Sequence, residues 1–282
     1  MGHMPAARFV DVFSQTPFRG NALAVFHDAH DLSDDEMAAI ARWTNLAETT
    51  FLCTPTDSGA DYRVRIWTTG GELPFAGHAT LGSAHAWLEA GGVPAVEDVV
   101  VQECGVGRVP VRRGPRLRFA APPLLRSGAV AGDEASRLVD ALGIDPADVV
   151  ELAWVDNGPG WVGVLLRSTD AVLAASPDPG RCAGVRVGLV AGYPAGSRAD
   201  GVAAEVRAFY SDGRDFAEDP VTGSVNAGLA QWLVPTGHLP TSYVAAQGTV
   251  LGREGRVHVD VVDGVVWVGG DTRTLVTGRR PA

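Results

Sequence analysis

Two short segments of the sequence place polar side chains next to a glycine that can open a helix. His78 follows Gly77, and Ser224 follows Gly223, with Asp219 just upstream. The first N–H groups of a helix lack internal partners and carry partial positive charge, so they bind anions. A glycine there lets a ligand approach the backbone closely. The two segments therefore predict a site for a carboxylate, or for the enolate that develops when a proton is removed beside one.

Glu48 is a further candidate for proton chemistry. It lies at an expected helix-to-strand junction, between apolar neighbours. Partial burial would raise the pKa of its carboxyl toward the range useful to a general acid or base. The alternatives are a surface glutamate at this position and, for His78, a histidine that only caps its helix.

The two glycine segments belong to a longer internal repeat. The pattern Glu-x-Pro-x-x-Gly-x-x-x-x-Gly-x-Ala begins at Glu72 and again at Glu218. The shorter pattern Val-Arg-x-aromatic precedes each copy, at Val64 and at Val206. A repeat of this length predicts two similar α+β lobes, with a boundary near the Pro122-Pro123 pair. Chance matching of small residues in a chain rich in glycine and alanine is the alternative.

The expected elements follow from alternation, capping and apolar spacing. One helix should begin after an N-cap at Ser33 and run to residue 43, and two more should span 77–88 and 223–233. Strands are expected at 8–13, 22–26, 49–52 and 62–67, twice between 99 and 118, and at 152–155, 161–166, 206–209, 256–262 and 265–268.

Composition excludes several classes of protein. The chain has 282 residues and a net charge of −10, and all 23 of its basic residues are arginine. Without lysine it can form neither a pyridoxal phosphate Schiff base nor a standard phosphate-binding P-loop. The negative charge disfavours nucleic acid as a partner. Three cysteines give no disulfide framework or zinc ribbon, and a metal site at His27 and His30 is less favoured than a solvated turn.

No apolar run approaches the 18 residues that a membrane helix needs, and no signal peptide is recognisable before the first expected strand. We therefore expect a soluble, cytoplasmic protein without a membrane partner.

Seven segments together resemble the PhzF family, the phenazine-biosynthesis isomerases and their relatives. The resemblance covers nearly the whole chain in the family's order. The segments are residues 9–13, 17–25, 47–51, 72–82, 218–224, 247–253 and 268–270.

The resemblance implies a diaminopimelate-epimerase-like α+β fold with two pseudo-symmetric lobes. Each lobe would be a mixed β-sheet wrapped around a central helix, with the active site in the cleft between the lobes. We assign residues 5–122 and 266–282 to the N-terminal lobe and residues 123–265 to the C-terminal lobe. The resemblance also implies an enzyme that needs no cofactor and no metal, and a homodimer.

The family's reaction identifies roles for the candidate residues. In the phenazine enzyme a glutamate moves a proton from C3 to C1 of trans-2,3-dihydro-3-hydroxyanthranilate, and the product tautomerises to a ketone. The matching glutamate is Glu48, with His78 and Asp219 as further catalytic residues. The resemblance assigns substrate binding to Gly77, Gly223 and Ser224. The expected partner is thus a small carboxylate, whose identity the motifs leave open.

Two other functions are compatible with the sequence. The same fold could serve an amino-acid epimerase or racemase, for which Cys104 is a thiol candidate because residues 103–108 superficially resemble the epimerase cysteine motif. Cys104 lies outside the internal repeat, however, and a strand follows it. The third possibility is a non-catalytic protein that binds a metabolite. Trp67, Trp161 and Tyr210 are candidate pocket liners, with core packing as the alternative.

Overall fold

A computed structural model describes residues 6–211 and 216–278 of the chain. The chain divides into two compact units. Unit 1 comprises residues 1–122 and 269–282, and unit 2 comprises residues 123–268. Strands dominate both units and helices are few, which confirms the predicted α+β class.

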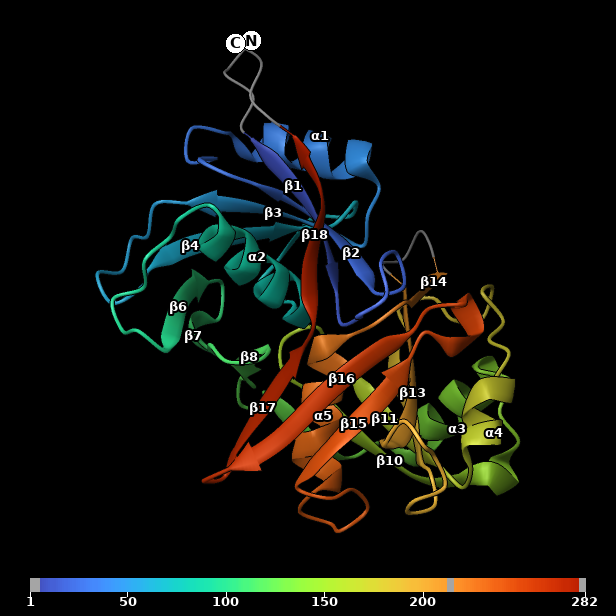
Figure 1. The fold of residues 1–282 in the computed structure, drawn as a ribbon. Coiled ribbons are helices and arrows are strands. Elements are labelled where there is room, and N and C mark those ends of the chain that lie inside the picture. The colour runs from blue at the N-terminus through green and yellow to red at the C-terminus, as the bar shows by residue number, and fades with distance from the viewer. Residues whose placement is uncertain (1–5, 212–215, 279–282) are drawn as a thin grey trace. The chain divides into compact units, whose positions relative to one another are not determined.

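Unit 1 is a mixed sheet with two helices (Figure 1). Its elements are β1 (Ala7–Val12), β2 (Asn21–Phe26), α1 (Asp34–Thr44), β3 (Glu48–Cys53), β4 (Tyr62–Trp67), β5 (Glu72–Leu73), α2 (Gly77–Glu89), β6 (Val99–Cys104), β7 (Gly107–Arg112), β8 (Leu117–Ala120) and β18 (Thr272–Gly278).

Two strand pairs of unit 1 are parallel, and each is connected by a helix. The chain passes from β2 to β3 through α1, and from β4 to β6 through α2. The other described pairs in this unit are antiparallel, including β1 with β2, β3 with β4 and β6 with β7. The C-terminal strand β18 pairs with β1, so the two ends of the chain meet in one sheet (Figure 1).

Helix α2 is the centre of unit 1. It contacts β1, β2, β3, β6, β8 and β18, and buries residues around its whole circumference. Small residues such as Gly77, Ala79 and Gly82 make this possible, since a helix enclosed by strands has no room for a bulky polar face. Helix α1 differs, because only Met37 and Ala41 are buried. Ser33 is its N-cap, as predicted, and forms a capping box with Glu36.

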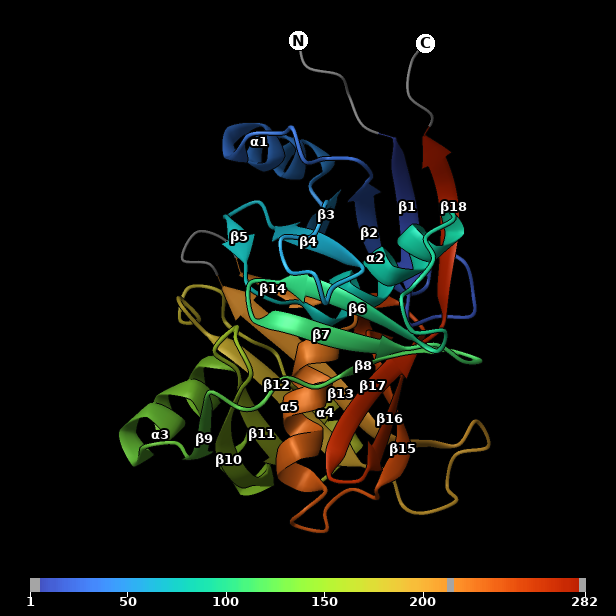
Figure 2. The ribbon, with the colours of Figure 1, turned by 90° about the vertical axis from the view of Figure 1, so that its left-hand side faces the viewer.

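The described part of unit 2 contains three α-helices and strands in both parallel and antiparallel pairs (Figure 2). Its elements are β9 (Arg126–Ala129), α3 (Gly132–Ala141), the 3₁₀ turn η1 (Pro146–Asp148), β10 (Val149–Asp156), β11 (Val162–Leu166), α4 (Thr169–Ala174), β12 (Arg186–Gly192), β13 (Val202–Ser211), β14 (Phe216–Asp219), α5 (Gly223–Leu233), β15 (Ser242–Gln247), η2 (Thr249–Leu251), β16 (Gly255–Val262) and β17 (Val265–Gly270).

The connectivity of unit 2 repeats that of unit 1. Strands β11 and β12 are parallel and connected through α4, and β13 and β15 are parallel and connected through α5. Helix α5 contacts β10, β11, β12 and β16, and nine of its residues are buried. Gly163 and Gly188 are paired in register, and a Cβ on either would collide with Val225 or Leu229 of this helix. These two glycines let α5 lie close to the sheet.

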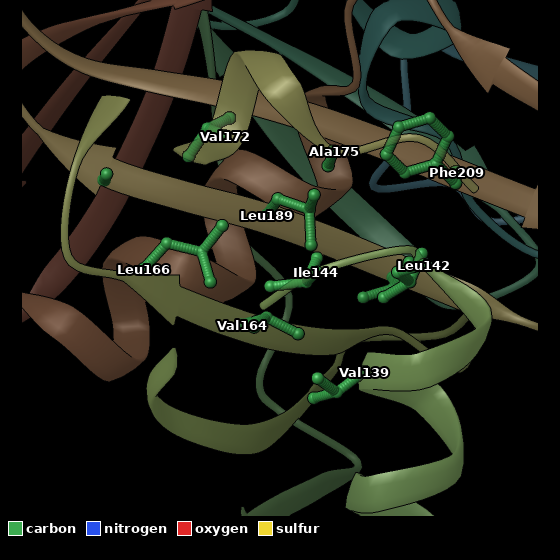
Figure 3. Packing of buried hydrophobic residues seen from close by; sticks show 11 residues of the cluster. Val139, Leu142, Ile144, Val164, Leu166, Val172, Ala175, Leu189 and Phe209 are labelled. Atoms are coloured by element: carbon green, nitrogen blue, oxygen red, sulfur yellow. The ribbon is translucent and has the colours of Figure 1, made fainter. Parts of the chain in front are cut away.

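The opposite face of this sheet carries a second apolar layer (Figure 3). Val164 on β11 and Leu189 on β12 alternate with the two glycines and pack against helices α3 and α4. From the helices and their ends, Val139, Leu142 and Val172 complete the cluster. Burial on both faces explains why these strands are rich in apolar residues.

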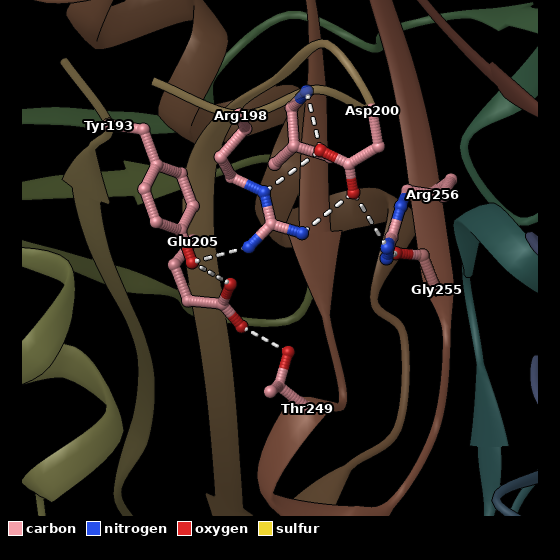
Figure 4. Close-up of polar contacts among 8 residues, drawn as sticks. Tyr193, Arg198, Asp200, Glu205, Thr249, Gly255 and Arg256 are labelled. Atoms are coloured by element: carbon pink, nitrogen blue, oxygen red, sulfur yellow. Dashed lines mark hydrogen bonds and ion pairs between the residues drawn. The ribbon is translucent and has the colours of Figure 1, made fainter.

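A loop of unit 2 is held by a polar network around Glu205 (Figure 4). Glu205 is buried and accepts hydrogen bonds from the Tyr193 hydroxyl at 2.8 Å and the Thr249 hydroxyl at 2.6 Å. Arg198 donates to both carboxylate oxygens of Asp200 at 2.9 and 2.6 Å, which holds the pKa of Asp200 below its ordinary value. Arg256 of β16 also donates to Asp200, at 3.1 Å, so the network connects this loop to strands β13 and β16.

The two strands expected between residues 99 and 118 are present as β6 and β7. A further short strand, β8, begins at the arginine-rich end of this region and was not predicted. Strands β9, β12, β15 and β18 and helices α3 and α4 were also missed. The edge strand β9, with the sequence Arg-Ser-Gly-Ala, is exposed along its whole length and so has no alternating pattern to find.

Candidate active site

The two repeated segments fold alike. Helix α2 begins at Gly77 and helix α5 at Gly223, as predicted. The preceding residues, Ala76 and Thr222, are extended, and neither side chain caps its helix. The N–H groups of the first turn are therefore not covered by the usual side-chain cap, which suits them to receive an anion.

In unit 1 the structure brings Glu48 and His78 together. Glu48 is the first residue of β3, and its side chain is 13% exposed. Its Oε2 lies 3.2 Å from Nε2 of His78, the second residue of α2, which is almost fully buried. The contact lacks the alignment of a hydrogen bond. Catalytic hydrogen bonds often have this loose geometry before substrate binds.

The protonation of His78 follows from its surroundings. Burial lowers the pKa of its imidazole to about 3, so the ring is neutral at physiological pH. The Asn21 side-chain amide nitrogen lies 3.5 Å from Nδ1. An amide nitrogen only donates, so Nδ1 is the acceptor and the ring's one proton resides on Nε2, facing Glu48. His78 is therefore a neutral donor next to a carboxyl group, suited to orient it or to polarise a bound oxygen.

In unit 2 the second residue of the helix is Ser224, and it is buried as well. The Trp161 indole N–H donates to Ser224 Oγ at 3.0 Å. The Asn157 side-chain amide donates to the Ser224 carbonyl at 2.9 Å. Both partners lie in the connection between β10 and β11, whose strands pack against α5.

Asp219 ends β14 and belongs to a network at the start of α5. Its Oδ2 accepts a hydrogen bond of 2.5 Å from the Thr222 hydroxyl. Gln247 donates to the Thr222 hydroxyl at 2.9 Å and accepts from the Thr222 backbone N–H at 3.0 Å. Asn226 donates to the same Gln247 oxygen at 2.9 Å. The network holds the carboxylate at the helix start, where the helix dipole favours negative charge.

Each unit thus contains one set of the predicted site residues. Glu48, His78 and Gly77 belong to unit 1, and Asp219, Ser224 and Gly223 belong to unit 2. The side chains that hold them in place were not predicted. Asn21 and Gln247 lie inside segments that carry the family resemblance, so that signal was available. Trp161 entered only as a possible liner, and no pattern marked Asn157.

The alternative nucleophile Cys104 is poorly placed for proton transfer. Its Sγ lies 3.6 Å from the Gly107 carbonyl, to which it donates, and burial raises the pKa of the thiol. Burial also raises the pKa of Cys53 and Cys182. A neutral thiol is a weak base.

The described residues include no group of side chains suited to bind a metal ion. His27 lies 2.6 Å from the Arg8 guanidinium, and burial together with Arg8 lowers its pKa to about 4. Across residues 6–211 and 216–278, no three side chains of His, Cys, Asp or Glu are grouped to hold a metal ion. In the same residues, no helix has the length and apolar content that crossing a membrane requires.

Comparison with known proteins agrees with this architecture. A family model described as phenazine biosynthesis-like protein matches residues 10–280. Antisense-enhancing sequence 1 of Schizosaccharomyces pombe is 34% identical over 299 residues, with 96% of each chain covered. The trans-2,3-dihydro-3-hydroxyanthranilate isomerase of Pseudomonas aeruginosa is 36% identical over 172 residues, 60% of each chain. A PhzF-family structure from Bacillus anthracis matches with a TM-score of 0.80 and 20% identity, covering 98% of both chains.

The last of these matches shows that the fold is shared with PhzF-family proteins, which confirms the predicted class. The chain belongs to the phenazine biosynthesis-like family, PhzC-PhzF, and is an isomerase.

Proposed function

We propose that this isomerase moves a proton on a small carboxylate, with Glu48 as its acid and base. The observation that carries the proposal is the pairing of Glu48 with His78. A largely buried carboxyl lies 3.2 Å from a neutral imidazole that presents its N–H. A base in this setting can take a proton from carbon and, as the acid, give it back.

Trans-2,3-dihydro-3-hydroxyanthranilate, on which the Pseudomonas relative is named as acting, is the substrate we propose to test first. Glu48 would remove the proton on C3, and the electron pair would move into the conjugated double bonds of the ring. The carboxyl, now protonated, would deliver a proton to C1. The enol left at C3 then tautomerises to the ketone. The reaction is redox-neutral, so acid and base groups suffice and we propose that no cofactor takes part.

The candidate groups at the two helix starts also have proposed roles. We propose that Ser224 and the N–H groups at Gly223 and Gly77 bind substrate oxygens, and that His78 and Asp219 take part in proton transfer. Preorganised donors stabilise charge that develops on a carboxylate during proton abstraction.

Two further properties rest on the family resemblance. We propose that the chain forms a homodimer and works in the cytoplasm. Light scattering on the purified protein tests the first, and a mass equal to a single chain would contradict it.

Proton NMR in D₂O tests the proposed function. The wild type, Glu48→Gln and the control Glu97→Gln are each mixed with trans-2,3-dihydro-3-hydroxyanthranilate. Glu97 is exposed in a loop of unit 1, so its substitution leaves the candidate site intact. We expect the substrate signals to disappear with the wild type and the control only.

Other outcomes discriminate between the alternatives. Turnover by Glu48→Gln at the wild-type rate would overturn the role of Glu48. No turnover by any of the three proteins would reject this substrate and leave other small carboxylates to test. Racemisation of an amino acid that Cys104→Ser abolishes and Glu48→Gln retains would favour the epimerase.

A further inference from the structure

The hydroxyl group of Ser224 makes an unusual set of contacts. Ser224 is 3% exposed, so bulk solvent contributes little to its hydrogen bonding. Its Oγ accepts the indole N–H of Trp161 at 3.0 Å. A serine hydroxyl has two lone pairs and one hydrogen, and an indole N–H only donates. The bond with Trp161 therefore uses a lone pair and leaves the hydrogen of Ser224 unassigned.

That hydrogen has no acceptor among the described residues. Serines inside helices commonly return it to a carbonyl one turn earlier, at Pro220 or Val221 in this case. No such bond is formed by Ser224. Buried donors without acceptors are rare in folded proteins, and each calls for an explanation. A ligand oxygen that arrives at this position would supply one.

The surrounding contacts hold Ser224 in this arrangement. The Asn157 side chain, which is fully buried, donates to the Ser224 carbonyl at 2.9 Å. Trp161 is 5% exposed, so its ring has little freedom to turn away. The backbone and the hydroxyl of Ser224 are thus held from two sides by residues of one loop.

We propose that Trp161 is a positioning residue that orients the Ser224 hydroxyl so that its hydrogen is available to the carboxylate of the substrate. This proposal rests on the proposed function, since it assigns a substrate group to the same site. A carboxylate oxygen only accepts, so it complements the hydroxyl hydrogen that Ser224 has left to donate.

The matched pair Trp161→Phe and Trp154→Phe tests the proposal. Both substitutions remove an indole N–H from unit 2, but the Trp154 nitrogen has no partner in the described part of the chain. With trans-2,3-dihydro-3-hydroxyanthranilate we expect Trp161→Phe to raise KM about tenfold with little change in kcat. Trp154→Phe should leave KM within about twofold of the wild-type value. Equal effects of the two substitutions would overturn the proposal.

A double-mutant cycle with Ser224→Ala separates positioning from packing. If Trp161 acts through the Ser224 hydroxyl, Trp161→Phe should have no further effect on KM once that hydroxyl is gone. A penalty that persists in the Ser224→Ala background means that Trp161 acts by packing, and contradicts the proposal.

Two further measurements do not depend on turnover of the substrate. The indole N–H signal of Trp161 should shift in Ser224→Ala, whether or not the protein is active. If trans-2,3-dihydro-3-hydroxyanthranilate is not converted, the proposed function fails on that substrate. Calorimetric titration with 3-hydroxyanthranilate then tests the carboxylate contact alone. Weaker binding shared by Trp161→Phe and Ser224→Ala supports the proposal, and no binding to the wild type overturns it.

Discussion

Units 1 and 2 have the same strand connectivity but hold the second residue of their central helix differently. In unit 1 that residue is His78, and Asn21 at the start of β2 donates to its Nδ1. In unit 2 it is Ser224, and Trp161 just before β11 donates to its Oγ. In both units a donor at or just before the second strand of an antiparallel pair, β1–β2 or β10–β11, occupies an acceptor on the helix. The N–H of His78 and the O–H of Ser224 are then available to donate to another group.

The difference lies in the chemistry that each helix residue can perform. An imidazole can exchange its proton, and its carboxyl neighbour Glu48 can as well. A hydroxyl with a pKa far above neutrality can donate a hydrogen bond but not a proton. The two units therefore share a backbone arrangement and differ in one residue at the helix start. His78 is suited to proton transfer, and Ser224 is suited to binding.

The repeated Arg and Glu residues form the same contact twice. Arg65 donates two hydrogen bonds to Glu72, and Arg207 donates two to Glu218. In each copy the guanidinium also lies over the aromatic ring two residues later, Trp67 at 5.4 Å or Phe209 at 4.8 Å. The Val-Arg-x-aromatic pattern is thus a stacked ion pair on one face of a strand. The burial of the pair and the further partners of the arginine differ between the units.

The largest expected difference concerns these ion pairs. Arg207 is 5% exposed and donates also to carbonyls at the end of α4, including Ala175 at 2.7 Å. Arg207→Met leaves Glu218 buried and uncompensated, and should lower the free energy of unfolding by about 3–5 kcal/mol. Arg65→Met removes a pair whose Glu72 is 38% exposed, and should cost at most about 1 kcal/mol. Urea denaturation of both variants measures this difference, and equal losses would contradict it.

A smaller difference is expected at the second glycine of the repeat. A Cβ on Gly228 would lie 2.4 Å from the Val155 carbonyl oxygen, which the sheet holds in place. A Cβ on Gly82 would lie 2.5 Å from a methyl of Leu23, a side chain that can turn. We expect Gly228→Ala to cost about 1–3 kcal/mol and Gly82→Ala clearly less. Thermal unfolding compares the two, and a greater loss in Gly82→Ala would show that unit 1 is the more tightly packed.

A third expected difference is a pH dependence that comes from the buried histidine of unit 1. Burial lowers the pKa of folded His78 to about 3, whereas in the unfolded chain it is about 6.5. Below pH 6.5 the unfolded state binds a proton that the folded state does not. Stability should therefore fall with decreasing pH, by up to about 1.4 kcal/mol per pH unit.

His78→Asn should flatten this pH dependence, as measured by urea denaturation between pH 7 and pH 4. His27, whose pKa is also lowered by burial, to about 4, contributes a similar slope to every variant. The exposed His238 of unit 2 provides the control, since His238→Asn should leave the profile unchanged. An unchanged profile in His78→Asn would mean that His78 is not buried as a neutral ring.

Most of the local structure was predictable because its signals are local. The capping box at Ser33, the helix starts at Gly77 and Gly223, and the strand 62–67 depend on residues a few positions apart. Strand β12 was missed because a fully buried strand interrupted by glycines has no alternation to read. The short helix α4 spans only six residues, which is too few for a helical period to emerge.

The sequence by itself determined which residues could perform chemistry: a glutamate before a strand, and a histidine and a serine after helix-opening glycines. These features persist in any fold that keeps the local backbone. The partners of those residues were decided only by the tertiary structure. Trp161 and Ser224 are 63 positions apart, and their contact depends on how β11 packs against α5. A hydrogen bond tolerates errors of only a few tenths of an ångström, so packing of the whole unit, rather than residue type, decides whether it forms.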